Sequence, residues 1–227
     1  MLYCVADGMG GHAGGATASR MAVDTIHRTV RTARQNGSVF PPEAGNLEVP
    51  EVLELLQRAV SEASRQIYEA SSRNPELHGM GTTATLVQFL GSRIYVAHVG
   101  DSRLYRSRAS GMTQLTRDHS LLEDYKDAKP DMTEEEERNF PHKNVITRAL
   151  GMRESVEVDI HQVSVEDGDI FLLCSDGLSG MVTDPQIQDI VQRSATDLER
   201  CVAELVDQAN RAGGTDNITC LVLGCHL

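Results

Sequence analysis

The sequence predicts an α+β fold in which antiparallel β-sheets are covered by pairs of helices. Two helical patterns follow one another near the N-terminus, and two more precede the last strand. Between them lie short strand-like segments separated by turn residues, and this tight spacing favours antiparallel meanders over βαβ crossovers. The chain shows no internal repeat, low-complexity segment or linker, so we expect a single domain over residues 1–227.

The N-terminal part combines one strand with two helices. Residues 2–6 are rich in strand formers and run into Asp7, after which a glycine-rich stretch follows. Apolar residues then recur every three to four positions over residues 17–37, which predicts a helix. Residues 37–50 contain three prolines and are predicted as a loop, whereas the apolar stripe of residues 51–73 predicts a second helix.

The middle of the chain is predicted to be rich in β-structure and to carry a flap. Short alternating segments bounded by Gly-Ser, Gly-Asp and Ser-Gly pairs predict four strands, at residues 82–90, 93–99, 102–106 and 112–115. A charged and polar segment follows, and we interpret residues 123–143 as an exposed flap. Within it, Thr133 and Glu136 have the spacing of a capping box and predict the start of a short helix.

The C-terminal part returns to strands and then to helices. Strands are predicted at about 156–163 and 169–174, and a final one at 218–223. Thr183 followed by Asp-Pro predicts a capped helix over residues 185–193. A second capping-box pattern, Thr196-x-x-Glu199, predicts the start of the last helix.

Composition and charge exclude several classes of function. The chain of 227 residues has 21 Lys and Arg against 33 Asp and Glu, a net charge of −12, so binding to nucleic acid is not expected. No apolar run reaches the roughly 20 residues needed to span a bilayer, and the first residues lack the features of a signal peptide. The five cysteines contain no C-x-x-C pair, which favours a reducing, cytoplasmic setting.

Aspartates follow three predicted strand ends or turns, and they are the candidate chemical groups. Asp7 and Asp176 each stand between an apolar strand and a glycine, and Asp216 lies in the variant Gly-Thr-Asp-Asn. One Asp-Gly pair alone marks a turn. Three carboxylates that converge would repel one another unless a cation lay among them, and oxygen-only ligands favour Mg²⁺ or Mn²⁺. The sequence therefore predicts a hard-cation site.

Seven short motifs follow one another along almost the whole chain. They are VADGMGGH at 5–12, GMGTTA at 79–84, VGDSR at 99–103, LTRDHS at 115–120, NVITRALG at 144–151, CSDGL at 174–178 and GTDN at 214–217. In this order they resemble the metal-dependent serine/threonine protein phosphatases, the PPM or type 2C family, in their short bacterial form. Each motif alone is weak, but seven in order are very specific.

The resemblance implies both a fold and a reaction. The family fold is a sandwich of two antiparallel sheets with a pair of helices on each outer face. The implied reaction is the hydrolysis of phosphoserine or phosphothreonine at a centre of two Mn²⁺ or Mg²⁺ ions, with a weaker third ion in bacterial members. A water activated at the metals attacks phosphorus in line, without a covalent enzyme intermediate.

The resemblance also assigns roles to individual residues. Asp7 is implied to bridge both metals and the carbonyl of Gly8 to bind one of them, while Asp176 and Asp216 hold the other. Asp7, Asp176 and Asp216 are therefore the predicted catalytic set. Asp118 resembles the carboxylate that holds the third metal together with Asp176, with a plain turn aspartate as the alternative.

Other motif residues are expected to play supporting roles. Asn217 is expected to support the site through hydrogen bonds, and residues 81–83 to let the backbone pass close to the centre. Asp101 is expected to act in a turn and in packing rather than as a ligand.

No histidine is assigned as the general acid. Many eukaryotic members have a histidine two residues after the Asp-Gly aspartate, and here that place is taken by Met9. His12 lies three residues further on, so the role does not transfer to it and a structural role is the main expectation. His119 and His142 are expected at the surface or in the flap.

One departure from the family leads to an alternative function. The family usually has a strand or two before VADG, with an arginine for the phosphate and an acidic residue that helps to hold a metal, and nothing here matches them. Reduced activity of this chain is the expectation. The alternative is a catalytically impaired domain that binds a phosphoprotein or a regulatory partner.

The expected partners are phosphoserine and phosphothreonine proteins. They are expected to be targets of a cognate kinase, and the phosphatase itself is expected to be a monomer that uses neither nucleic acid nor a membrane. The acid-rich flap predicts a preference for phosphosites with basic or neutral surroundings.

Overall fold

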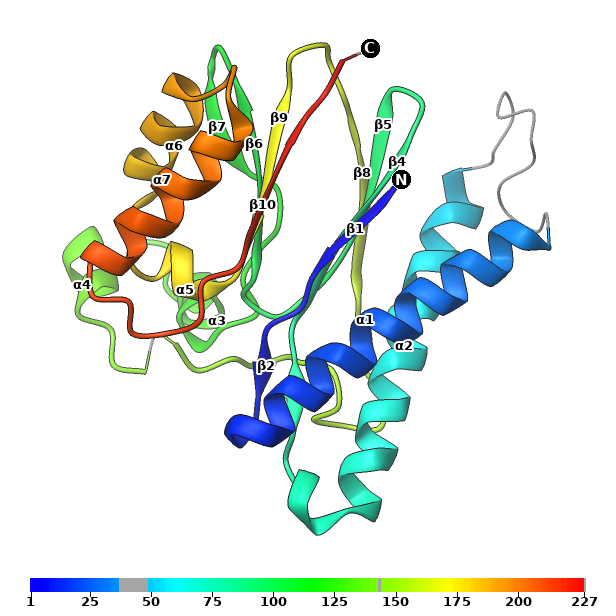
Figure 1. The fold of residues 1–227 in the computed structure, drawn as a ribbon. Helices are drawn as coiled ribbons and strands as arrows, with labels where there is room; N and C mark the ends of the chain where they lie inside the picture. Colours follow the sequence, from blue (N-terminus) through cyan, green and yellow to red (C-terminus); the bar gives the residue numbers. More distant parts are fainter. Residues whose placement is uncertain (37–48, 143, 227) are drawn as a thin grey trace.

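Two antiparallel sheets lie face to face at the centre of the molecule (Figure 1). The computed structural model describes residues 1–36, 49–142 and 144–226. One four-stranded sheet has the order β1-β4-β5-β8, the other has the order β10-β9-β6-β7, and β2 pairs with β3 in a small separate ribbon. The strands are β1 (Leu2–Val5), β2 (Gly8–Met9), β3 (Gly81–Thr82), β4 (Ala84–Leu90), β5 (Arg93–Val99), β6 (Arg103–Arg108), β7 (Gly111–Gln114), β8 (Asp159–Ser164), β9 (Ile170–Cys174) and β10 (Cys220–Gly224).

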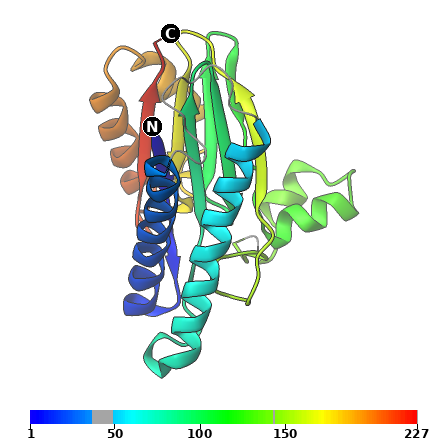
Figure 2. The same ribbon diagram turned by 90° about the vertical axis from the view of Figure 1, so that its right-hand side faces the viewer.

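Helices cover the outer face of each sheet, as the turned view also shows (Figure 2). The long helices α1 and α2 pack on the first sheet, and α6 and α7 pack on the second. The helices are α1 (Gly11–Gln35), α2 (Val49–Arg73), the 3₁₀ turn η1 (Pro75–Leu77), α3 (Leu121–Ala128), α4 (Glu134–Arg138), α5 (Asp176–Ser179), α6 (Asp184–Arg193) and α7 (Leu198–Arg211). The predicted α+β sandwich flanked by helix pairs is confirmed.

The central strands β4 and β9 are largely apolar on both faces, because each lies in a sheet that is covered on both sides. In β4, Leu86 faces α1 and α2, whereas its neighbour Val87 lies between the two sheets. Phe171 and Leu173 of β9 meet Val87 in this middle layer. Adjacent strand residues point to opposite faces, so a strand buried on both sides needs apolar side chains in succession. This packed middle layer fixes the strand ends from which the site residues project.

Two local predictions differ from the structure, and a third falls largely outside the described residues. The helix predicted from residue 17 begins at Gly11, because the glycine-rich stretch forms the first turns of α1. The last helix is capped by Asp197, whose carboxylate accepts a hydrogen bond from the backbone of Arg200, and not by Thr196. The loop predicted at 37–50 lies mostly outside the described residues, and α2 already begins at Val49.

The predicted flap contains two short helices, α3 and α4, that project from the body of the sandwich (Figure 2). The capping box at Thr133 and Glu136 is confirmed, with both reciprocal hydrogen bonds formed. The helix α3 was not part of the sequence prediction. No helix in the described part of the chain has both the length and the apolar character needed to cross a membrane.

Candidate active site

The loop that carries Asp7 is held by the threonines of the GTT motif. The backbone N–H of Asp7 donates to Thr83 Oγ1 at 2.9 Å. In return, the backbone N–H of Thr83 and the Thr82 hydroxyl each donate to the Asp7 carbonyl, both at 2.8 Å. Thr83 Oγ1 also lies 2.7 Å from the hydroxyl of Ser102. The motif was predicted to be structural, and its threonines act by fixing the backbone from which the Asp7 carboxylate projects.

Close backbone contact explains why glycine follows Asp7. A Cβ atom at Gly8 would lie 2.0 Å from the carbonyl oxygen of Gly15 in α1. The start of α1 therefore rests directly on the Asp7–Gly8 segment. This contact requires small residues in the first turns of the helix, which is why those turns have no apolar periodicity.

The other two predicted catalytic aspartates lie on neighbouring loops. Asp176 is the first residue of α5, and a Cβ atom at Gly177 would lie 2.2 Å from the carbonyl oxygen of Asn217. The Ser175 hydroxyl donates to the same Asn217 carbonyl at 3.1 Å. These contacts join the loop after β9 to the loop before β10, so Asp176 and Asp216 line the same cavity. Asn217 supports the site through its backbone.

The acidic groups interact strongly enough to perturb one another. Burial, contact with Asp176 and the charge of Asp216 and Asp101 raise the pKa of Asp7 to about 7. One buried carboxylate oxygen of Asp176 has no hydrogen-bond partner among the described residues. Among the described residues, no group of three or more acidic, histidine or cysteine side chains is already arranged closely enough to hold a metal ion. Mutual repulsion of this kind is relieved by a cation, and the all-oxygen donor set fits Mg²⁺ or Mn²⁺.

Asp101 belongs to this acidic cluster, although the sequence pointed to a turn residue. It is only 8 % exposed and lines the cavity with Asp176 and Asp216. Burial and the charges of Asp176 and Asp118 raise its pKa to about 7. The carboxylate has no ion pair or side-chain hydrogen bond among the described residues. Its own backbone N–H donates to it, but a buried carboxylate among other carboxylates, with no cationic partner, is unfavourable in the absence of a cation.

Asp118, the predicted ligand of a third metal, lines the same cavity but is already paired. Arg103 donates to both oxygens of its carboxylate at 2.7–3.0 Å, and the Gln114 side chain donates to one of them at 2.9 Å. Arg103 in turn donates to the hydroxyl of Tyr105 at 2.9 Å. Asp118 is therefore less available to a cation than Asp101.

His119 is not on the surface, as the sequence suggested, but is 6 % exposed behind the Gly100–Asp101 turn. The backbone N–H of Gly100 donates to His119 Nδ1 at 3.0 Å, and the backbone N–H of His119 donates to the Gly100 carbonyl at 2.8 Å. The ring contacts that of His98 in a tilted arrangement, with a centroid distance of 4.8 Å and an interplanar angle of 38°. His119 therefore fixes the turn that carries Asp101. The backbone of His12 lies in the first turn of α1.

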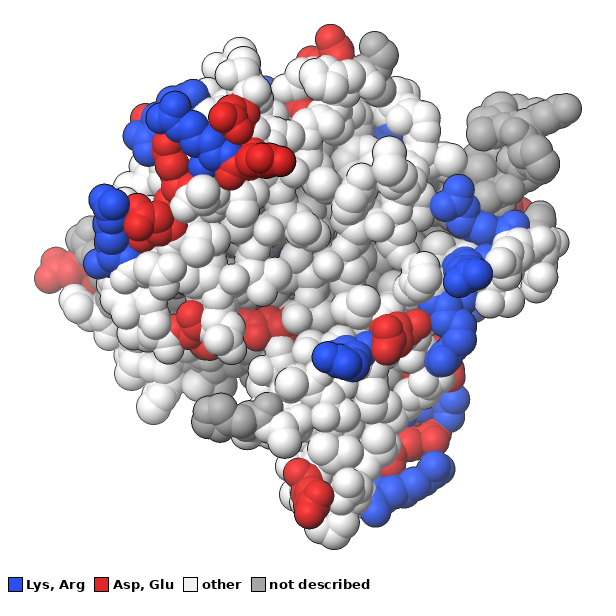
Figure 3. Space-filling model, viewed as in Figure 1, with Lys and Arg blue, Asp and Glu red and all other residues white. Residues whose placement is uncertain are grey.

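The cavity has a volume of about 310 Å³ and lies between α5, the flap and the β5–β6 turn. In the space-filling view, acidic surface appears in the region where Figure 1 shows α5 and β2 (Figure 3). Asp7 and Gly8 line an adjoining hollow together with Asn217. The structure thus brings Asp7, Asp176, Asp216 and Asp101 to one region, with Asp118 at its side.

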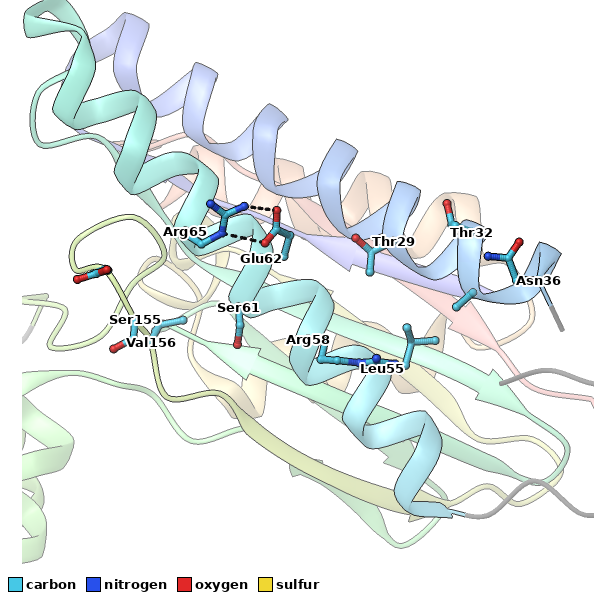
Figure 4. A pocket seen from close by; sticks show the side chains of 12 residues that line it. Thr29, Thr32, Asn36, Leu55, Arg58, Ser61, Glu62, Arg65, Ser155 and Val156 are labelled. Carbon is cyan, nitrogen blue, oxygen red and sulfur yellow. Dashed lines mark hydrogen bonds and ion pairs between the residues drawn. The ribbon is translucent and has the colours of Figure 1, made fainter. Parts of the chain in front are cut away.

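A larger hollow of about 650 Å³ lies along α1 and α2, away from these carboxylates (Figure 4). Thr29, Arg58 and Leu55 line it, and Arg65 pairs with Glu62 beside it at 2.7 Å. None of the predicted site residues reaches it, so the acidic cavity remains the candidate active site.

Comparison with known proteins identifies the family. The model of the family described as "Protein phosphatase 2C" matches residues 1–220. This chain belongs to the protein phosphatase 2C family. It is 36% identical over 226 residues to the serine/threonine phosphatase stp of Listeria innocua, covering 100% of this chain and 85% of that protein. It is also 36% identical to the protein phosphatase PhpP of Streptococcus pneumoniae, covering 96% of this chain and 83% of that protein.

Solved structures of the family superpose on the whole sandwich. The serine/threonine phosphatase PstP/Ppp of Mycobacterium tuberculosis is similar with a TM-score of 0.85 and 33% identity, covering 100% of this chain and 88% of that chain. The catalytic domain of a PstP in complex with two manganese ions has a TM-score of 0.80 and 32% identity, covering 97% and 86%. A relative with the same fold thus binds manganese. This agrees with the hard-cation site that we infer from the carboxylates of this chain.

Proposed function

We propose that this protein is a metal-dependent phosphatase that hydrolyses phosphoserine and phosphothreonine in proteins. The observation that carries the proposal is the acidic cluster of Asp7, Asp176 and Asp216 in a chain of the phosphatase 2C family. Relatives that align over nearly the whole chain are named serine/threonine phosphatases. Nothing in the fold or in these relatives favours the catalytically impaired alternative.

The proposed ligands are the carboxylates of Asp7, Asp176 and Asp216 and the carbonyl of Gly8. When bound, Mn²⁺ or Mg²⁺ supplies a water nucleophile at neutral pH and neutralises charge on the phosphoryl oxygens. Asp101 is the carboxylate that we propose for a further cation beside Asp176, because it is buried and forms no ion pair or side-chain hydrogen bond among the described residues. That Asp118 binds a third cation remains a prediction, because its ion pair with Arg103 would compete with the cation for the carboxylate.

The residues of this chain contribute position and charge. The hydrogen bonds between the Asp7 backbone and the side chains of Thr82 and Thr83 hold Asp7 in place before any ligand arrives, so little ordering is required on binding. Because the pKa of Asp7 is raised to about 7, a fraction of the protein molecules carry a proton on Asp7 at neutral pH. Cation binding displaces that proton. The close contact of Gly177 with Asn217 keeps Asp176 and Asp216 on one side of the cavity.

Three further features belong to the proposal. The substrates are targets of a cognate serine/threonine kinase, the whole chain is one phosphatase domain, and it acts as a monomer. We propose a cytoplasmic setting because all five cysteines are free thiols.

The test is phosphate release from a phosphothreonine peptide by the purified chain with Mn²⁺ and with EDTA. The proposal expects turnover with Mn²⁺ that EDTA abolishes and that added Mn²⁺ restores. Turnover that is equal in EDTA and Mn²⁺ would refute the metal-dependent mechanism. The absence of turnover in a folded sample that binds Mn²⁺ would refute the phosphatase itself.

A further inference from the structure

A fully buried histidine lies near the end of β5, just before the turn that carries Asp101. His98 is 0 % exposed, and it faces Thr85 of β4 across the first sheet. Its side chain points to the same side of β5 as those of Ile94 and Val96, which pack between the two sheets. Because a polar ring in an apolar layer is unfavourable without hydrogen bonds, both ring nitrogens of His98 need partners.

Both ring nitrogens of His98 have a partner: Nε2 lies 2.9 Å from the carbonyl oxygen of Arg117, and Nδ1 lies 2.9 Å from Oγ1 of Thr85. A carbonyl oxygen only accepts, so Nε2 carries the ring proton and donates it to Arg117. Burial lowers the pKa of His98 to about 3, so the ring is neutral and Nδ1 is an acceptor. Among the described residues, the Arg117 carbonyl accepts no other hydrogen bond. Thr85 has a second acceptor, because its hydroxyl also lies 2.8 Å from the Ser102 carbonyl.

The hydrogen bond to Arg117 holds the segment that supports the Asp101 turn. This segment continues into His119, whose ring contacts that of His98 at a centroid distance of 4.8 Å. The Gly100 N–H donates to His119 Nδ1 at 3.0 Å, and the His119 N–H donates to the Gly100 carbonyl at 2.8 Å. Through this segment, His98 acts on the backbone directly before Asp101.

The contact with Thr85 reaches the other side of the same turn. Ser102 directly follows Asp101, and its carbonyl lies within hydrogen-bond distance of the Thr85 hydroxyl. The Ser102 hydroxyl lies 2.7 Å from Thr83 Oγ1, which accepts the Asp7 N–H. These three hydroxyl side chains are at most 1 % exposed, and hydrogen bonds gain strength in such a low-dielectric interior. The network therefore joins the backbone of Asp7 to that of Asp101.

We propose that His98 is a positioning residue for a cation at Asp101. It touches neither substrate nor metal, and it acts by holding the backbone on both sides of Asp101, so that the carboxylate lies beside Asp176. The hydrogen bond from Nε2 to Arg117 carries this role, because Thr85 keeps an acceptor without the ring whereas Arg117 loses its donor. Groups that orient a metal ligand typically contribute about 10- to 100-fold to metal affinity. The inference rests on the proposed function, in which Asp101 is a cation ligand.

Two amides of different length separate the two hydrogen bonds of the ring. The side-chain amide of His98→Gln reaches the place of Nε2 and keeps a donor for Arg117, and Thr85 then donates to Ser102. His98→Asn reaches only the place of Nδ1 and leaves the Arg117 carbonyl without its donor. Mn²⁺ binding is measured by calorimetry, and the relevant site is the one that Asp101→Asn removes. We expect its Kd to rise about tenfold or more in His98→Asn and to stay within about threefold of wild type in His98→Gln.

A double-mutant cycle and the metal-free protein separate positioning from a general loss of stability. In the Asp101→Asn background, His98→Asn should have no further effect on Mn²⁺ binding, because His98 acts through Asp101. In EDTA, the Gly100 amide should exchange with solvent about tenfold faster in His98→Asn than in His98→Gln. NMR of metal-free wild type should find the His98 ring proton on Nε2. His27→Asn is the matched control, because His27 is exposed on α1 and its replacement should change none of these readouts.

The outcomes that overturn the proposal differ from those that overturn the proposed function. An equal Kd in His98→Asn and His98→Gln would overturn the positioning role, as would an effect of His98→Asn that persists in the Asp101→Asn background. A wild-type ring proton on Nδ1 would remove the hydrogen bond to Arg117, and this result does not depend on the folding of any variant. A wild type that binds Mn²⁺ in the expected pattern but does not hydrolyse a phosphothreonine peptide would refute the proposed function instead.

Discussion

Replacing Asp101 by Asn should stabilise the metal-free protein at alkaline pH. Asp101 is buried among carboxylates, and its pKa is raised from 3.8 to about 7. Each pH unit of displacement corresponds to about 1.4 kcal/mol, so ionised Asp101 costs on the order of 2–4 kcal/mol of folding free energy once relaxation of the cavity is allowed for. For a chain of this size, this corresponds to a rise in Tm on the order of 5–15 °C. Asparagine removes the charge and keeps the shape.

The pH dependence gives the sign of the effect. Because the pKa is higher in the folded state than in the unfolded state, the penalty is absent below the unfolded value of 3.8 and complete above about 7. In EDTA, the gain in Tm of Asp101→Asn over wild type should therefore be only about a third of its full size at pH 5 and largest at pH 8. Added Mn²⁺ should reduce the gain, because the cation stabilises wild type through the same carboxylate.

Thermal unfolding followed by circular dichroism, in EDTA and in Mn²⁺, measures this effect. Asp124→Asn is the matched control, because Asp124 is an exposed carboxylate of the flap and its replacement should change stability by less than about 0.5 kcal/mol. The reasoning is refuted if Asp101→Asn lowers the Tm at pH 8 in EDTA. It is also refuted if the Tm rises equally at pH 5 and pH 8, since the gain would then have no link to ionisation.

Three other substitutions test the supports of the site. Gly177→Ala places a Cβ atom 2.2 Å from the Asn217 carbonyl, so we expect a loss of about 1–3 kcal/mol in urea unfolding and a large loss of turnover. Thr83→Val removes the acceptor for the Asp7 N–H, and we expect about 1–3 kcal/mol of destabilisation with weaker binding of Mn²⁺ in calorimetry. His119→Ala leaves the Gly100 N–H without its acceptor, so we expect a higher Mn²⁺ concentration for half-maximal turnover.

Each of these expectations has an outcome that contradicts it. Gly91 occupies an open turn, so Gly91→Ala should cost about 1 kcal/mol and leave turnover unchanged; an equal loss of turnover in both glycine variants would remove the argument from close contact. Full Mn²⁺ affinity in Thr83→Val would show that the Asp7 backbone needs no such anchor. An unchanged Mn²⁺ dependence in His119→Ala would separate the histidine from the turn that it contacts.

The sequence predicted most of the fold because the spacing of apolar residues indicates which face of an element is buried, and turn residues mark where elements end. The succession of elements along the chain and the antiparallel pairing followed from short apolar runs with tight turns between them, whereas the order of the strands within each sheet was not predicted. The start of α1 was missed because its first turns contain glycines that lie on the Asp7–Gly8 segment, and glycine carries no hydrophobic periodicity. Asp197 displaced Thr196 as the cap of α7 because both residue types form N-caps and only the geometry distinguishes them.

The site was predicted less completely, for a physical reason. Asp7, Asp176 and Asp216 stand in recognisable motifs, and the structure brings them together. The motif around Asp101 also has the form of a turn, and only its burial beside Asp176 shows its place in the acidic cluster. The pairing of Asp118 with Arg103 depends on two segments fifteen residues apart, and no local pattern reports it.

The most direct test of the central claim is phosphothreonine-peptide turnover as a function of Mn²⁺ concentration for wild type and Asp176→Asn. Asp176 contacts Asp7 and has a buried oxygen without a partner, so the amide should remove a ligand while the fold persists. We expect saturable Mn²⁺-dependent turnover in wild type and a loss of at least about 100-fold in the variant, the range typical of removing a group that stabilises the transition state. A folded Asp176→Asn variant with the turnover and Mn²⁺ dependence of wild type would contradict the account.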